Sequence, residues 1–259
     1  MKICLVQSDI IPDNITQNLL RYETLFQQIK QQPDIIFFPE MFNCGFSPSL
    51  VNNAEPLGGE SMVFLQSTAH RFQCDIVASL PVNTNGKIYN RLLWINKEEI
   101  SGFYDKRHLY FGEEKEYCTP GCEKVIIPRN NVRFLPLICY DIRFPVWCCN
   151  RYDNGEFLYD CIVLIANFPA QRSDILQTLA QARAIENQSF VIVCNRIGLD
   201  GNGNPHLGKS MVINPLGKII AEAPENKEFL LETEINIELL EKIRRKFPIY
   251  KDWDKDELQ

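Results

Sequence analysis

The sequence predicts an α/β fold in which β-sheets are covered by helices. The length of 259 residues fits one large domain, so we expect residues 1–259 to form a single domain. Several apolar runs, such as that at 160–166, are continuous rather than alternating, which is typical of strands that are buried on both faces. Strand–helix–strand patterns are also mixed with hairpin signals. Together these observations favour layered sheets and helices.

The first half of the chain is predicted to begin with a strand and a helix. The opening run KICLVQS predicts a buried strand. Asn14 is placed to cap a helix whose apolar residues keep helical spacing up to about Lys30, and residues 61–73 predict a second helix. The other strands predicted here are IIFFPE, CDIVASLPV, IYNRLLWIN and EEISGFYDK, with Asn85-Gly86 as a hairpin turn.

The second half is predicted to begin with an irregular polar segment at 105–122. A short helix is expected near 144–152 and a long helix at about 172–187. The buried stripe predicted for the long helix consists of Ile175, Leu176, Leu179, Ala182, Ile185 and Glu186. The predicted strands are VIIP, VRFLPLICYD, DCIVLIANFP, SFVIVCNRIG, GKSMVINP, KIIAEAP and EFLLETEIN.

Charge and hydropathy exclude several classes of protein. The chain carries a net charge of −6 and no basic cluster, which argues against binding nucleic acid by phosphate neutralisation. Its apolar runs are far shorter than the ~20 residues that a helix needs to span a bilayer, so we expect no membrane partner. The N-terminal MKICLVQSDI lacks the pattern of a signal peptide, which predicts a cytoplasmic protein. The KDEL string is followed by Gln259 and does not form a terminal retention signal.

Ten cysteines raise the question of disulfides or a metal site. Most lie within apolar runs, as Cys161 and Cys194 do, where a reduced cysteine behaves as a small buried hydrophobe. Cys118 and Cys122 are spaced like metal ligands, but no second ligand pair or nearby histidine completes a tetrahedral site. We therefore expect neither a metal nor another cofactor.

Three apolar runs end abruptly in a side chain that can carry chemistry. Glu40 follows IIFFP, Lys106 follows GFYD and Cys139 follows FLPLI. The ends of strands are where α/β proteins often build their sites. Each residue alone also has a structural interpretation, as a helix-start carboxylate, a solvated lysine or a buried cysteine. A glutamate placed directly after a buried run needs a partner, however, and a helix start after Cys139 would stabilise a thiolate. The set predicts a cysteine nucleophile with a carboxylate base and a lysine.

The segments around these residues resemble the signatures of the nitrilase superfamily of carbon–nitrogen hydrolases. They are FPEMF, YDKRHL and LICYDIRFP, and their central residues lie 66 and 33 positions apart in the order of that family. The resemblance extends over essentially the whole chain through ANFP, ARAIENQ, NRIGLDGNG and KFPIYKDWD, and it is greatest to the bacterial ω-amidase branch. It implies a four-layer αββα sandwich, a Glu–Lys–Cys site and a homodimer.

The resemblance also implies a second glutamate beside the three site residues. The candidates are the glutamates of GEEKEYCTPG. The family usually places this residue seven positions before the glycine of the following turn, which selects Glu114 from Gly121. The segment before it is one residue shorter than is usual in the family, so Glu113 remains the alternative.

The resemblance implies a role for each residue in amide hydrolysis. Cys139 would attack the carbonyl carbon, Glu40 would transfer protons, and Lys106 with the backbone N–H of Tyr140 would stabilise the oxyanion. Glu114 would hold Lys106 or the water. The ω-amidase branch hydrolyses the terminal amide of α-ketoglutaramate and α-ketosuccinamate through a cysteine thioester and releases ammonia and a dicarboxylate. Such a substrate carries a carboxylate, so a cation should face the pocket. The substrate-binding candidates are Tyr140, Arg143, Asn167, Phe168 and Arg172.

Three alternatives remain open from the sequence. The chain could be an N-carbamoyl amidase or a nitrilase that uses the same residues. It could be a catalytically silent binding protein of the same fold, although the presence of all three site residues argues against this. A redox or metal protein built on the cysteines is disfavoured because the sequence has no CxxC motif and its three histidines are dispersed.

Overall fold

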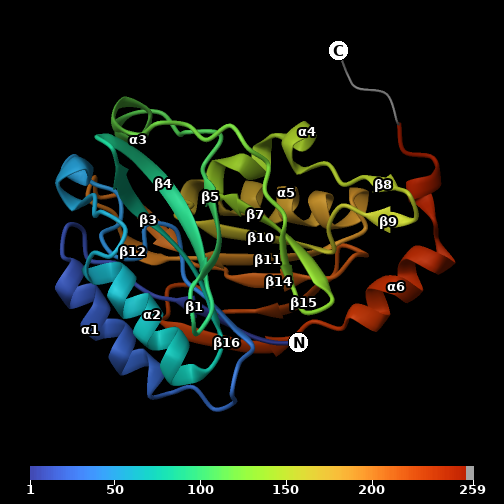
Figure 1. Cartoon of the computed structure of the whole chain (residues 1–259), viewed down its shortest axis with the longest axis horizontal. Coiled ribbons are helices and arrows are strands. Elements are labelled where there is room, and N and C mark those ends of the chain that lie inside the picture. Colours follow the sequence, from blue (N-terminus) through green and yellow to red (C-terminus); the bar gives the residue numbers. More distant parts are fainter. Residues whose placement is uncertain (255–259) are drawn as a thin grey trace.

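The computed structural model describes residues 1–254, apart from the side chain of Glu113. Its centre consists of two six-stranded sheets (Figure 1). The strands of the first sheet, in spatial order, are β16 (Phe229–Glu234), β1 (Lys2–Gln7), β2 (Ile35–Phe37), β3 (Asp75–Thr84), β4 (Lys87–Ile95) and β5 (Ile100–Asp105). Those of the second sheet are β15 (Ile219–Glu222), β14 (Met211–Ile213), β11 (Phe190–Asn195), β10 (Cys161–Ala166), β7 (Val132–Ile138) and β6 (Ile127–Arg129).

Helices cover the outer faces of both sheets (Figure 1). Helices α1 (Ile15–Phe26) and α2 (Glu60–Phe72) lie side by side against the first sheet, and α5 (Ser173–Glu186) lies against the second. The remaining helices are α3 (Glu113–Tyr117), α4 (Pro145–Cys148) and α6 (Ile237–Lys246). Two small hairpins, β8 (Tyr152–Asp153) with β9 (Glu156–Phe157) and β12 (Ile197–Leu199) with β13 (Pro205–Leu207), complete the fold. The predicted αββα sandwich is confirmed.

The alternation of side chains along β1 explains the four layers. Ile3 and Leu5 point into the core between the two sheets, whereas Cys4 and Val6 point into the core under α1 and α2. Successive side chains of a strand face opposite sides of the sheet, so both sides of this strand are buried. This is why its sequence is a continuous apolar run.

Several local predictions are confirmed. The Asn14 side chain caps α1 by accepting the Gln17 N–H at 3.1 Å. Asn85 and Gly86 form the turn between β3 and β4, where both residues have positive φ, as tight hairpins require. Within the described residues all ten cysteines are free, and only Cys122 and Cys149 are exposed.

Two helices end earlier than the sequence predicted. Helix α1 ends at Phe26 rather than near Lys30. The backbone N–H groups of Lys30 and Gln31 donate to the Glu232 carboxylate instead of to helix carbonyls. The helix expected at 144–152 ends at Cys148, where the chain becomes extended. None of the helices within residues 1–254 is long and apolar enough to span a bilayer.

The predicted buried stripe of α5 was partly wrong. Leu176 is buried, but Ile175 and Ile185 are 41% and 51% exposed. The face that packs on the second sheet is instead completed by Ala180 and Ala184. Small side chains let the helix approach the sheet closely, so the larger isoleucines point outward.

Candidate active site

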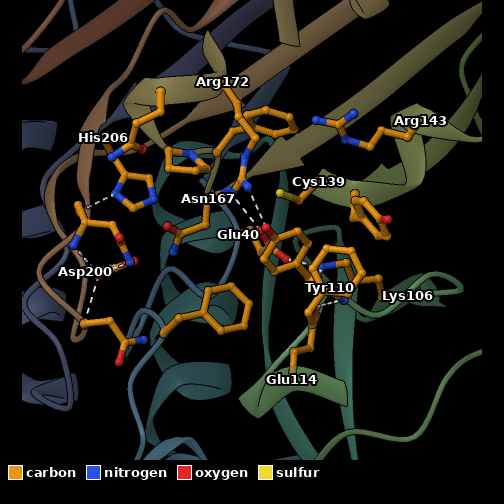
Figure 2. Close-up of a pocket in the computed structure, with 18 residues that line it drawn as sticks. Glu40, Lys106, Tyr110, Glu114, Cys139, Arg143, Asn167, Arg172, Asp200 and His206 are labelled. Atoms are coloured by element: carbon orange, nitrogen blue, oxygen red, sulfur yellow. Dashed lines mark hydrogen bonds and ion pairs between the residues drawn. The ribbon is translucent and has the colours of Figure 1, made fainter. Parts of the chain in front are cut away.

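The structure brings Glu40, Lys106 and Cys139 together in one buried site (Figure 2). Glu40 lies three residues beyond β2, Lys106 directly follows β5, and Cys139 directly follows β7. Their exposed fractions are 0%, 1% and 9%. The Lys106 Nζ donates to Glu40 Oε1 at 2.7 Å, and the Cys139 thiol is hydrogen-bonded to Glu40. Charged groups this far from water need such partners.

Cys139 begins a short 3₁₀ turn, Cys139–Arg143, and its backbone has a positive φ of 44°. The sequence predicted that a helix start would stabilise a thiolate at this position. That prediction was wrong, because burial and the neighbouring Glu40 carboxylate raise the pKa of the Cys139 thiol well above its ordinary value. The resting cysteine is therefore a thiol that needs a base.

Glu40 is suited to accept that proton. Burial raises its pKa above the ordinary glutamate value, while the Lys106 ammonium opposes the shift. The backbone N–H of Asn167 donates to Glu40 Oε2 at 2.9 Å. The Glu40 carboxylate is thus held by fixed donors from both sheets.

Glu114 is the second glutamate beside these residues. It is 2% exposed, and Lys106 Nζ lies 2.9 and 2.8 Å from its two oxygens. The backbone N–H of Tyr110 donates to its Oε2 at 2.7 Å. Burial opposes the charge of Lys106, but Glu114 and Glu40 outweigh this and hold its pKa well above the ordinary lysine value. The alternative, Glu113, has a side chain outside the described part of the structure.

Asn90, on β4, also belongs to the site but is not among the predicted residues. Its Nδ2 donates to Glu40 Oε1 at 2.8 Å and to Glu114 Oε1 at 2.7 Å. Asn90 lies on the strand face that also carries the core residues Leu92 and Trp94. A polar residue at an inward-facing position of an apolar strand was the signal that could have revealed it.

A third buried carboxylate, that of Asp141, fixes the turn that carries Cys139. It accepts the Ile138 N–H at 3.1 Å, the Tyr104 hydroxyl at 2.8 Å and the His108 N–H at 3.0 Å. These bonds join the turn to the end of β5. The position of Cys139 relative to Lys106 is therefore set by a fully buried group.

Glu40, Lys106, Cys139 and Glu114 line a cavity of about 470 Å³. All five predicted substrate-binding residues line it. Tyr140 is the second residue of the turn, where backbone N–H groups have no acceptor within the turn. The side-chain Nδ2 of Asn167 is buried without a hydrogen-bond partner among the described residues. The full lining consists of Glu40, Phe46, Lys106, Tyr110, Phe111, Glu114, Cys139, Tyr140, Arg143, Asn167, Phe168, Pro169, Gln171, Arg172, Asp200, Asn202, Asn204 and His206.

The two arginines of the cavity have different partners. Arg172 donates to the Tyr110 hydroxyl at 2.6 Å, as one of the dashed lines in Figure 2 marks. The Arg143 guanidinium lies 6.0 and 5.8 Å from the ring centres of Tyr140 and Phe168. Among the described residues no carboxylate forms an ion pair with Arg143. Its charge is available to a ligand.

His206, on β13, lines the opposite side of the cavity and is also not among the predicted residues (Figure 2). Its ring is hydrogen-bonded to the backbone of Asn204 and Asn167. Burial, with a contribution from Arg196, lowers the pKa of His206 to about 4, so the ring is neutral near pH 7. The β12–β13 hairpin that carries it was not predicted, and no sequence pattern linked it to the site.

Residues 1–254 contain no cluster of three or more histidine, cysteine or carboxylate side chains arranged to hold a metal ion. The chemistry that the site itself offers is a thiol next to a buried carboxylate, with a lysine bound to that carboxylate. These groups are the ones that acyl transfer requires.

Comparisons with known proteins agree with this geometry. The carbon-nitrogen hydrolase family model matches residues 2–245. The chain is 37% identical to the omega-amidase YafV of Yersinia enterocolitica over 98% of this chain and 97% of that protein, and 31% identical to the 2-oxoglutaramate amidase of Bacillus subtilis over 98% of each. A CN-hydrolase superfamily protein from Xanthomonas campestris, solved with an arsenic adduct in its active site, is 35% identical, with a TM-score of 0.95 over 100% of this chain and 99% of that one. The chain therefore belongs to the carbon–nitrogen hydrolase family, which confirms the resemblance to the nitrilase superfamily.

Proposed function

We propose that the chain is an ω-amidase that hydrolyses the terminal amide of small ω-amido acids, such as α-ketoglutaramate and α-ketosuccinamate, to a dicarboxylate and ammonia. The observation that carries this proposal is that one cavity contains both the thiol–carboxylate–lysine group and the guanidinium of Arg143, which forms no ion pair among the described residues. The names of the two relatives described above, an omega-amidase and a 2-oxoglutaramate amidase, support the same substrate class.

In the proposed acylation, Cys139 gives its proton to Glu40 Oε2 as its sulfur attacks the amide carbon. The carbonyl oxygen becomes an oxyanion, which Lys106 Nζ and the backbone N–H of Tyr140 stabilise. A single donor of this kind contributes about 10²–10³ in rate in other enzymes. Glu40 then returns the proton to the amide nitrogen, the C–N bond breaks, and ammonia leaves behind a thioester on Cys139.

In the proposed deacylation, water replaces ammonia beside Glu40. Glu40 takes one proton from the water as its oxygen attacks the thioester carbon, and the same oxyanion donors act again. The C–S bond then breaks and Glu40 returns the proton to the sulfur. Glu114 keeps Lys106 charged and in position through both steps. No histidine is required.

Arg143 is the proposed anchor of the substrate carboxylate. Arginine pairs with carboxylates through two parallel hydrogen bonds, and the Arg143 charge has no competing protein carboxylate among the described residues. Arg172 is a weaker candidate because Tyr110 already occupies one of its donors. The unpartnered Nδ2 of Asn167 supplies a further donor for a substrate oxygen, and Phe168 packs behind Arg143.

A substrate panel tests this proposal. Ammonia release would be measured from α-ketoglutaramate, α-ketosuccinamate and succinamate, and from a neutral amide of similar length. A simple nitrile and an N-carbamoyl amino acid represent the other enzymes of the superfamily. We expect the carboxylated amides to give the highest kcat/KM. Faster turnover of the nitrile or the carbamoyl compound would contradict the ω-amidase assignment, and silence on every compound would favour a binding protein.

We also propose that residues 1–259 form one domain that acts as a homodimer in the cytoplasm. The free state of all ten cysteines supports a reducing compartment. The exposed Ile175 and Ile185 of α5 provide apolar surface that a second copy would cover. Sedimentation of the purified protein tests the dimer, and a mass equal to the 30.0 kDa chain would contradict it.

A further inference from the structure

Asn90 joins the two carboxylates of the site. Its side-chain Nδ2 lies 2.8 Å from Glu40 Oε1 and 2.7 Å from Glu114 Oε1, and it is fully buried. Its Oδ1 has no hydrogen-bond partner among the described residues. Only the donor end of the amide can face two carboxylates, so these two bonds alone fix its orientation.

The bonds to Glu40 differ between its two oxygens. Oε1 accepts from both Lys106 Nζ, at 2.7 Å, and Asn90 Nδ2, at 2.8 Å. A carboxylate oxygen has about two lone-pair sites, so Oε1 is saturated. Oε2 accepts the Asn167 N–H at 2.9 Å and keeps a lone pair for a proton. A proton that leaves Cys139 therefore has one oxygen of Glu40 to go to.

The charges around Asn90 explain why a neutral donor is needed. Glu40 faces Lys106 from the end of β5, Glu114 from α3 and Cys139 from the turn after β7. Cys118 is close enough to be influenced by the charges of Glu114, Lys106 and Glu40. Among the described residues, Lys106 is the one cation that forms ion pairs with both Glu40 and Glu114. Two charge-assisted hydrogen bonds from one amide stabilise these carboxylates without adding a second cation beside the nucleophile.

We propose that Asn90 is a positioning residue that holds Glu40 and Glu114 side by side, stabilises the Cys139–Glu40 pair once it has lost a proton, and directs the proton of Cys139 to Glu40 Oε2. The inference rests on the proposed chemistry of Cys139 and Glu40, but it does not depend on which amide is the substrate. It assigns to β4 a part in the reaction that none of the three sequence signatures contains.

The reactivity of the Cys139 thiol tests this inference without a substrate. The rate of alkylation of Cys139 by iodoacetamide would be followed against pH by peptide mapping, which separates Cys139 from the exposed Cys122 and Cys149. The thiol reacts when the Cys139–Glu40 pair has lost one proton, so the acid limb of this profile reports the first apparent pKa of the pair.

Two variants remove the donor in different ways. Asn90→Leu keeps the branching at Cγ but has no donor, and Asn90→Asp keeps the shape but replaces the donor with an acceptor. Loss of the donor makes the ionised pair less favourable, so the acid limb should move to higher pH by about one unit in Asn90→Leu. Asn90→Asp should move it further in the same direction, because a third acidic group then faces Glu40 and Glu114.

Asn43 provides a matched control. Like Asn90, it is a fully buried amide whose Nδ2 donates to a carboxylate and another oxygen, here Glu55 and Ser61, while its Oδ1 has no partner among the described residues. Asn43→Leu should lower the stability of the protein and leave the acid limb in place. The inference is overturned if the limb stays in place in both Asn90 variants while the rate merely falls, which is the signature of a structural role.

The same experiment separates this inference from the proposed function. If the protein releases no ammonia from any amide but the limb moves in the Asn90 variants, the ω-amidase assignment fails and the role of Asn90 stands. If amide turnover is rapid and the acid limb does not move in the Asn90 variants, the ω-amidase assignment stands and the role of Asn90 fails.

Discussion

At the scale of single residues, the chemistry of the site follows from burial. The Cys139 thiol and the Glu40 carboxyl both have raised pKa values, because burial disfavours their charged forms. The two groups therefore act as a coupled pair that shares a proton, rather than as a preformed thiolate beside a neutral acid. Below the first apparent pKa of the pair Glu40 is protonated and cannot accept the proton of Cys139, so activity should fall as pH decreases through that value.

Arg143 provides a prediction about substrate selection. In Arg143→Gln the cation is lost, and kcat/KM for α-ketoglutaramate should fall about 10- to 100-fold, the equivalent of one charge-assisted hydrogen bond. Turnover of a neutral amide should change little. The exposed Arg151 is the control, since Arg151→Gln removes a cation outside the cavity. Equal losses on charged and neutral amides would show that Arg143 does not bind the carboxylate.

Glu114 provides a prediction about the catalytic lysine. In Glu114→Gln the ammonium of Lys106 loses one of its two carboxylates, so kcat should fall on the order of 10²-fold, as when an oxyanion donor is misplaced. Glu116 lies on the same helix with an exposed side chain, and Glu116→Gln should retain full activity. Steady-state rates of ammonia release measure both. A Glu114→Gln enzyme within twofold of the wild type would refute this role.

The sequence was informative about residues that follow strands and less informative about residues within them. Glu40, Lys106 and Cys139 each interrupt an apolar run, and the structure brings all three together. Asn90 lies within β4, where the alternation of the strand marks it as an inward-facing polar residue but does not show which groups it contacts. Its role depends on Glu114, which is 24 positions away in the chain.

At the scale of elements, the loop that follows helix α3, which carries Glu114, is hydrogen-bonded to the residue after β5. The Gly121 N–H donates to the Lys106 carbonyl at 2.9 Å. A Cβ at Gly121 would overlap the backbone carbonyl of Asp105, so only glycine fits this close approach. The loop and the strand thereby set the distance between Glu114 and Lys106.

Gly121→Ala tests this contact. The added methyl group must push the loop away from β5, so we expect a loss of about 1–3 kcal/mol in the free energy of unfolding and a lower kcat. Gly155 is the control, because its added Cβ would meet no atom within 4 Å and only its positive φ of 87° would be strained. That strain costs about 1–2 kcal/mol. Denaturant unfolding measures the stability of both variants, and ammonia release measures their kcat. Gly155→Ala should keep full kcat. A Gly121→Ala enzyme that also keeps full kcat would contradict the proposed role of this contact.

The elements that were mispredicted are those whose position depends on tertiary contacts. Helix α6 was not predicted. Its Leu240 and Ile243 are buried, and Arg244 donates to Asp160 at 2.7 Å and to the Gln188 carbonyl at 3.0 Å. The stripe of α5 was misplaced because alanines, which give a weak periodic signal, form its packed face.

At the scale of the whole molecule, the site exists only where the two sheets meet. Glu40 and Lys106 follow strands of the first sheet, whereas Cys139 and Asn167 follow strands of the second. The Glu40 N–H donates to the Ala166 carbonyl at 3.3 Å, and the Asn167 N–H donates back to Glu40 Oε2. These bonds join the sheets at the reacting atoms. Strand patterns predicted the α/β class, but the order of the strands rests on contacts between distant segments that no local pattern encodes.

The most direct test of the account is ammonia release from α-ketoglutaramate by the wild type and by Cys139→Ala, with circular dichroism to show that both are folded. We expect rapid release by the wild type and a loss of at least about 10³-fold in Cys139→Ala, because an alanine side chain cannot form the thioester. A folded Cys139→Ala protein that keeps activity close to the wild type would contradict the assignment of Cys139 as the nucleophile.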